Sequence, residues 1–210
     1  IGGYAFGYCN NLESVLIPAS LASVGNTTSN FDKLYIPYGG PFAYCSSLEN
    51  AQLEDGMKKI PGNLFYNCTC LTKITIPDSV TKEVTLPNIR KNIVAGMFEG
   101  CTSLENIVLP ETVTAIRENA FKNCTSLKDI TWSKAPEIIE SNAFRNCSAL
   151  TEVAIPGTVK SIGDCAFLNC DALTAVTLPD SVTSIGEWVF YDRVAEHRST
   201  QCRHAVRNHD

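Results

Sequence analysis

Histidine is nearly missing from this sequence: the 210 residues contain three, His197, His204 and His209, all close to the C-terminus. Its absence from the first 190 residues excludes serine–histidine–aspartate and cysteine–histidine catalysis there, together with histidine-ligated zinc. No C-x-x-C pair and no G-x-G-x-x-G loop is present, which argues against a zinc ribbon or a dinucleotide-binding loop. We therefore expect a non-enzymatic protein with no catalytic residues, no cofactor and no metal ion.

Long apolar runs and an excess of basic charge are also missing. No stretch approaches the roughly 18 uninterrupted apolar residues that a membrane-spanning helix needs. The 17 Lys and Arg residues against 22 Asp and Glu give a net charge of −5, whereas nucleic-acid binding requires a basic face. Apolar residues make up 44% of the chain, which is enough for a buried core. We expect a folded protein that binds no nucleic acid and inserts no segment into a membrane.

The chain does contain an internal repeat, and cysteine marks it. Seven of the ten cysteines end or follow a phrase of the type A-F-x-x-C. These seven are Cys9, Cys45, Cys68, Cys101, Cys124, Cys147 and Cys170. The last four lie 23 residues apart, and a second phrase, L-x-x-I-x-I-P, follows each turn phrase. A period of this length predicts a solenoid, because one unit cannot bury its own apolar face whereas stacked units can.

The two phrases suggest how one coil is built. The I-x-I-P part alternates as a half-buried strand does, and proline ends the strand because it has no N–H to donate. The following V-x-x-I-x-x-x-A-F part is expected to return across the other side as a short turn or a one-turn helix. The predicted fold is an α/β solenoid with one parallel sheet of about eight or nine strands. One inward column is expected to comprise Leu104, Ile107, Leu109, Val113, Ile116, Phe121 and their equivalents in other repeats.

Two spacings break the rule. Cys9 and Cys45 are 36 residues apart, and the segment 31–37 within this gap repeats the strand phrase. We interpret the first gap as two shortened repeats of 19 and 17 residues. Cys68 and Cys101 are 33 residues apart, and here a loop or partial coil is favoured over a full coil.

The repeat also divides the chain. Residues 1–190 are predicted to form the array. Residues 191–210 lack the pattern and are predicted to form a disordered tail or a polar cap. The first residues, IGGYAF, align with IGDCAF at 162–167, in mid-repeat. We therefore expect the sequence to be a fragment of a longer array. The tail also carries Cys202 beside its histidines, but their spacing matches no common metal site.

The repeat resembles that of the BspA-like leucine-rich-repeat family. The resemblance rests on IPGTVKSIG at 155–163, LPDSVTSIG at 178–186 and the recurring A-F-x-x-C, and it covers residues 1–190. It implies a curved leucine-rich-repeat solenoid in a secreted or cell-surface protein that adheres to host proteins or to other cells. Protein partners, including host extracellular-matrix or cell-surface proteins, are what the resemblance implies. A structural spacer arm that presents other domains of a larger surface protein is the alternative.

The recurring cysteines and asparagines each allow two interpretations. The seven repeat cysteines are predicted to form a buried, reduced ladder, because buried free cysteine behaves as a small hydrophobic residue. A disulfide framework is the alternative, with Cys68/Cys70 and Cys165/Cys170 the better candidate pairs. The N-x-S/T sequons at Asn67, Asn123 and Asn146 are glycan acceptors or, as we favour, part of the repeat's turn. The sequon at Asn26 lies in an irregular stretch.

The outward strand positions decide where a partner can bind. Tyr35 is the outward aromatic residue in these positions, with Asp32 and Lys33 beside it, and it is expected near Glu13 and Glu49 on adjacent strands. Binding is usually carried by a few aromatic or charged residues. We therefore predict a docking site at Glu13, Asp32, Lys33, Tyr35 and Glu49; a solvated sheet face without a role is the alternative. Trp132 falls on an inward position and is expected in the core.

Overall fold

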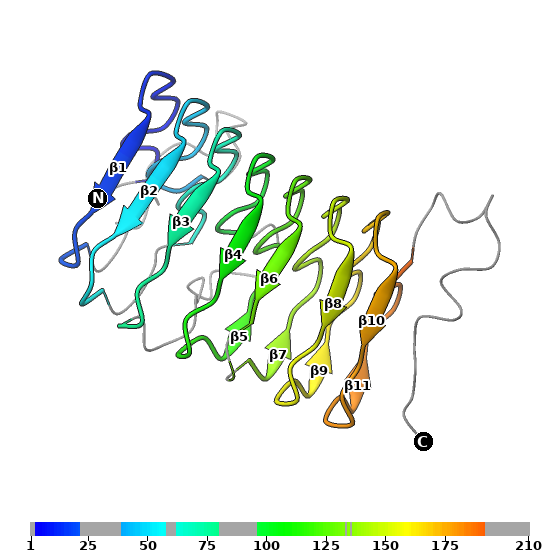
Figure 1. Ribbon diagram of the computed structural model, residues 1–210. Helices are drawn as coiled ribbons and strands as arrows, with labels where there is room; N and C mark the ends of the chain where they lie inside the picture. The colour runs from blue at the N-terminus through cyan, green and yellow to red at the C-terminus, as the bar shows by residue number, and fades with distance from the viewer. Residues whose placement is uncertain are drawn as a thin grey trace.

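The computed structural model describes residues 3–21, 39–57, 62–79, 96–132, 134 and 136–191. These residues form stacked coils of short parallel strands joined by turns (Figure 1). The strands are β1 (Ser14–Ile17), β2 (Asn50–Leu53), β3 (Lys73–Thr75), β4 (Asn106–Val108), β5 (Ala115–Ile116), β6 (Asp129–Thr131), β7 (Ile138–Ile139), β8 (Glu152–Ala154), β9 (Ser161–Ile162), β10 (Ala175–Thr177) and β11 (Ser184–Ile185).

One side of the stack carries the I-x-I-P strands. β1, β2, β3, β4, β6, β8 and β10 follow one another along the stack (Figure 1), and their pairing is parallel within the groups β1–β2–β3, β4–β6 and β8–β10. Each strand alternates as its sequence predicts: Ile74 is buried between exposed Lys73 and Thr75. The predicted parallel arrangement is confirmed, with seven such strands in the described ranges.

The return side of the coil differs from the expectation. The described residues contain no helix; instead β5, β7, β9 and β11 form a second parallel sheet. Equivalent residues of successive coils lie side by side, so that Ile139 pairs with Ile162. An extended segment in this register exchanges backbone hydrogen bonds with the coils on either side, which a single helical turn could not do. The predicted one-turn helix is therefore wrong for the described coils, and a turn with a short strand replaces it.

The A-F-x-x-C phrase forms a turn segment that is hydrogen-bonded to the next coil. The amides of Asn142, Phe144 and Asn146 donate to the carbonyls of Asp164, Ala166 and Leu168, at 2.9, 2.7 and 2.8 Å. Asn142 and Asn146 have φ values of 57° and 62°, and asparagine tolerates this left-handed conformation better than most residues. The recurring asparagines are thus explained by the backbone that they adopt.

The described turns on either side of each long gap stack directly on each other. β1 pairs with β2, Ser14 opposite Asn50, and the rings of Phe6 and Phe42 stack at 5.0 Å. The segment 31–37, on which the prediction of two shortened repeats depends, lies outside the described residues, so this stays a prediction. Phe65 and Phe98 stack at 6.1 Å across the second gap, as expected for a loop or partial coil. Residues 22–38 and 80–95, which fill much of these gaps, lie outside the described residues.

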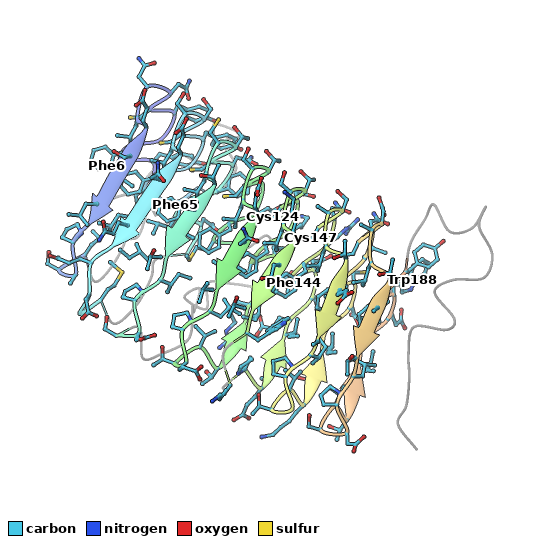
Figure 2. The ribbon with its side chains drawn as sticks, in the orientation of Figure 1. Phe6, Phe65, Cys124, Phe144, Cys147 and Trp188 are labelled. Atoms are coloured by element: carbon cyan, nitrogen blue, oxygen red, sulfur yellow. The ribbon has the colours of Figure 1, made fainter. Side chains whose placement is uncertain are left out.

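The core is a set of columns that run along the stack. The predicted column is confirmed, because all six of its named residues are buried. Beside it, one phenyl ring per coil stacks on the next at 5.0–6.1 Å, from Phe6 to Phe190. Phe6, Phe65 and Phe144 mark this phenylalanine stack in Figure 2. Trp132 is partly buried and packs edge-on against Phe144, as its inward position predicts.

Candidate interaction surface

The broadest regular surface of the described coils is the strand face, the outward side of β1, β2, β3, β4, β6, β8 and β10. Each coil places three exposed side chains on it, and these form three rows along the stack. The edge row is Glu13, Glu49, Thr72, Glu105, Lys128, Thr151 and Thr174. The middle row is Ser14, Asn50, Lys73, Asn106, Asp129, Glu152 and Ala175. The far row is Leu16, Gln52, Thr75, Val108, Thr131, Ala154 and Thr177.

The strand face is hollowed over β1, β2 and β3. A shallow concavity of about 400 Å³ lies there, lined by the residues at 14–16, 50–52 and 73–75. Leu16 lies on β1, the first of these three strands. Its side chain is 62% exposed, which is unusual for a leucine in this otherwise well-buried array. An exposed apolar side chain beside polar neighbours in a concave region is a common feature of a binding surface.

The predicted docking residues are only partly placed. Glu13 and Glu49 are both exposed and lie on neighbouring coils, where the Glu49 amide donates to the Glu13 carbonyl at 2.9 Å. Asp32, Lys33 and Tyr35 lie outside the described residues, so their grouping with the two glutamates stays a prediction.

The structure adds residues to this surface that the predicted site omitted. Leu16, Asn50, Gln52, Lys73 and Thr75 line the concavity next to Glu13 and Glu49. The period-two alternation of the strand phrase already places these side chains outward. The alternation does not predict the concavity, because curvature depends on how successive coils are rotated relative to one another. No single repeat encodes this rotation.

Charge on the strand face is mostly acidic and sparsely paired. Lys128 and Glu105 form an exposed ion pair at 3.2 Å across β6 and β4. In the middle row, Asp129 on β6 and Glu152 on β8 are also exposed. Exposed pairs of this kind contribute little to stability, so these charges are available for a partner.

The repeat cysteines have a structural role that the structure makes explicit. In each of six coils the thiol donates to a phenylalanine carbonyl of the preceding coil at 3.0–3.3 Å; the donors are Cys45, Cys68, Cys101, Cys124, Cys147 and Cys170. Burial raises the pKa of the Cys68 thiol to about 12. It also raises the pKa values of Cys101, Cys124 and Cys147 well above the ordinary value. Cys124 and Cys147 lie on successive coils in Figure 2.

The predicted reduced ladder is confirmed for these six, because they are buried free thiols. Cys9 is exposed instead of buried, and it lies in the first described coil, where no preceding described coil covers its thiol. Cys70 and Cys165, members of the two candidate disulfide pairs, are also free. The ladder is thus a packing and hydrogen-bonding element, not a disulfide framework.

The recurring asparagines form a second ladder next to the thiols. The Asn146 side-chain amide donates to the Asn123 side-chain carbonyl at 2.7 Å, and Asn169 donates to Asn146 at 2.9 Å. A glycan on Asn146 would be attached to the nitrogen that makes this bond. The geometry therefore favours the turn interpretation of the sequon at Asn146. Asn26 lies outside the described residues.

The described ranges contain no group of three or more His, Cys, Asp or Glu side chains placed to hold a metal. Nor does any helix there have the length and apolar character needed to cross a membrane.

Parallel coils with leucine, isoleucine and phenylalanine columns define a leucine-rich-repeat solenoid. The sequence profile of the BspA type leucine rich repeat region, in six copies, matches residues 1–82 and 81–195. The chain therefore belongs to the BspA type leucine-rich-repeat family. No curated protein matches it.

Solved leucine-rich-repeat structures resemble the chain. The Treponema pallidum leucine-rich-repeat protein TpLRR is 28% identical with a TM-score of 0.55, covering 69% of this chain and 72% of that protein. A Bacteroides ovatus leucine-rich-repeat protein is 22% identical with a TM-score of 0.49, covering 90% and 56%. A leucine-rich cell surface protein of Faecalibacterium prausnitzii is 24% identical with a TM-score of 0.42, covering 94% and 65%. The chain thus spans little more than half of the Bacteroides protein.

Proposed function

We propose that this chain is a non-enzymatic protein-binding array whose strand face over β1, β2 and β3 docks partner proteins. The observation that carries the proposal is the concavity of about 400 Å³ on this face. Exposed Leu16 lies at it, with Glu13 and Glu49 beside it. An apolar anchor rimmed by polar and charged groups is the arrangement found at protein interfaces.

The partner class and location follow from the family. BspA-like repeats are associated with secreted or cell-surface proteins that adhere to host proteins or other cells, and we extend this to the present chain. Asp32, Lys33 and Tyr35 remain part of the proposed site with Glu13 and Glu49. The proposed domain division is an array over residues 1–190 and a tail or cap over 191–210.

Adhesion to immobilised host extracellular-matrix proteins tests the proposal. The variant Leu16→Asp, which removes the apolar anchor, is expected to lower binding about tenfold or more. The double variant Glu13→Lys with Glu49→Lys, which reverses the charge beside it, is expected to have an effect of the same size. Tyr35→Ala with Lys33→Glu tests the remaining predicted residues. Lys128→Glu and Glu152→Lys, on the same face in the regular coils, are the matched controls. If adhesion is lost only in these controls, the binding site lies in the regular coils from β4 onward, and its assignment to β1, β2 and β3 is wrong.

One observation favours the alternative of a spacer arm. The phenylalanine stack runs without interruption through every described coil, and a continuous core of this kind holds an array at a fixed length. If the chain is only a spacer, the unmodified chain does not adhere to the matrix proteins, and neither the strand-face variants nor the controls change this. Adhesion that depends on Leu16 separates the two functions.

A further inference from the structure

The far row of the strand face carries no charge in any coil. Its residues are aliphatic, hydroxyl-bearing or amide-bearing from β1 to β10, and the two large aliphatic side chains, Leu16 and Val108, are 62% and 60% exposed. The register is continuous within each sheet group: Leu16 lies opposite Gln52, and Val108 opposite Thr131. This row is therefore a neutral stripe that crosses the strands along the axis of the stack.

All the charge on this face lies to one side of that stripe. The edge and middle rows contain five acidic residues, Glu13, Glu49, Glu105, Asp129 and Glu152. They contain two basic residues, Lys73 and Lys128, and Lys128 is already paired with Glu105. The flank of the stripe is thus acidic on balance, with acidic residues at β1, β2, β4, β6 and β8, whereas β3 contributes Lys73 and β10 contributes no charge.

The spacings of the neutral far row and of the charged rows beside it match an α-helix laid across the strands. Neighbouring coils are about 4.8 Å apart, and an apolar stripe on a helix recurs about every 5.4 Å along its axis. The middle and far rows are two residues apart on each strand, about 7 Å, which is within the roughly 10 Å width of a helix. One helix can therefore contact the neutral row and the acidic flank at once.

We propose that the strand face binds a cationic amphipathic helix of a partner protein, its apolar stripe on Leu16 and Val108 and its Lys or Arg flank on the acidic rows. This rests on the proposed function and names the chemistry of its partner. Leu16 and Val108 are three strands apart, at least about 14 Å because β3 and β4 are neighbours without a hydrogen-bonded ladder, and a helix of three to four turns bridges this span. The charge lies on one flank, so the helix has a preferred orientation about its own axis.

Synthetic peptides titrated against the full chain test this. The probe is a helix-forming Lys/Leu peptide of about 18 residues, some 27 Å long, with leucine at i, i+3, i+4 and i+7. A peptide of the same composition in scrambled order and a Glu/Leu peptide of the same pattern are the peptide controls. The Lys/Leu helix is expected to bind, and the two controls at least tenfold more weakly.

Paired variants locate the binding. Leu16→Ser with Val108→Ser is expected to weaken binding of the Lys/Leu helix about tenfold or more, whereas Ile138→Ser, at an exposed aliphatic residue on β7, leaves it unchanged. Glu13→Gln with Glu49→Gln is expected to weaken binding severalfold and to reduce its salt dependence. Asp78→Asn with Asp180→Asn removes two exposed charges outside these rows and is the charge-matched control. Circular dichroism and the melting temperature confirm that each variant is folded.

Three results would overturn the inference: equal binding of the scrambled peptide, equal weakening by the control variants, or no binding of the Lys/Leu helix. The first means non-specific attraction to an acidic protein, and the second means binding elsewhere. If no peptide binds while Leu16→Asp still abolishes adhesion to matrix proteins, the helical partner is wrong and the proposed function stands. If Leu16→Asp leaves both unchanged, the proposed function is wrong as well.

Discussion

The coils that carry β1, β2 and β3 and the regular coils from β4 onward share one turn segment but differ in the chain between successive turns. In the regular coils the cysteines are 23 residues apart, whereas two earlier spacings are 36 and 33. The turns nevertheless stack directly in both regions, at 5.0 Å for Phe6 and Phe42 and 5.2 Å for Phe121 and Phe144. Extra residues are therefore tolerated between the strand and the next turn, while the strand and the turn themselves stay in register.

The two regions also solve the same backbone problem with different side chains. At the left-handed position before cysteine, the regular coils have Gly100 and then Asn123, Asn146 and Asn169, whose side chains form a hydrogen-bonded ladder. The first two coils have Tyr8 and Tyr44, with φ values of 60° and 63°, and their rings stack at 4.6 Å. A left-handed backbone is unfavourable for a bulky residue, so aromatic stacking offsets a cost that asparagine avoids. The comparison predicts that the regular coils are the more stable part of the array.

Alkaline unfolding is expected to give the largest effect and to act through the regular coils. Cys101, Cys124 and Cys147 have pKa values raised well above the ordinary 9.0 by burial. Their unfolded forms lose protons first, so the stability they contribute is complete below about pH 9 and is lost as the pH rises toward the folded pKa. The loss is about 1.4 kcal/mol per thiol for each pH unit above 9.

Urea denaturation from about pH 8 to about pH 10 measures this loss. Cys124→Ala is expected to flatten the pH dependence, because it removes one of these buried thiols. A free energy of unfolding that stays constant over this range would contradict the assignment of buried protonated thiols.

Breaking the phenylalanine stack in the middle is expected to cost more than breaking it at its first ring. Phe144 is fully buried between Phe121 and Phe167, and Phe144→Ala is expected to lower the free energy of unfolding by about 3–5 kcal/mol. Phe6 is 43% exposed, and Phe6→Ala is expected to cost less than about 2 kcal/mol. Chemical denaturation of both variants decides the comparison, and equal losses would refute it.

Removing a thiol from the ladder is expected to have a smaller effect. Cys147→Ala leaves the Phe121 carbonyl without its thiol donor and opens a small cavity, at a cost of about 1–3 kcal/mol. Cys9→Ala, at an exposed position, is expected to change stability by less than about 0.5 kcal/mol. Native thiol labelling is a second measurement: Cys9 and Cys70 are expected to react quickly and the buried ladder only after unfolding. Rapid labelling of Cys124 would argue against the ladder.

The smallest expected effect is a gain in stability. Cys165 has a φ of 57° at the position where neighbouring coils have Asn119 and Asn142. Cys165→Asn restores the residue that tolerates this conformation and is expected to stabilise the protein by about 0.5–1 kcal/mol. Thermal denaturation measures the shift. Asn142→Cys, the reverse change one coil earlier, is expected to destabilise by a similar amount, and a change of the opposite sign in either variant would contradict the explanation.

Much of the strand face could be predicted from the sequence. The I-x-I alternation fixes which side chains of each strand point outward, so Glu13 and Glu49 were correctly expected on the surface. The concavity over β1, β2 and β3 could not be predicted, because it depends on the rotation between coils. The direct pairing of β1 with β2 could not be predicted either, because the strand phrase is a local pattern, whereas this pairing is decided by the stacking of the turns on either side.

The sequence by itself determined the period, the inward columns and the reduced cysteine ladder, because a 23-residue repeat places equivalent side chains on top of one another. Only the tertiary structure decided how the return path is built. The segment at Ile116, Ile139 and Ile162 is too short to declare a helix or a strand on its own propensity. It becomes a strand because the neighbouring coils offer backbone partners at both edges, as in the pairing of β7 with β5 and β9, and such partners exist only once the coils are stacked.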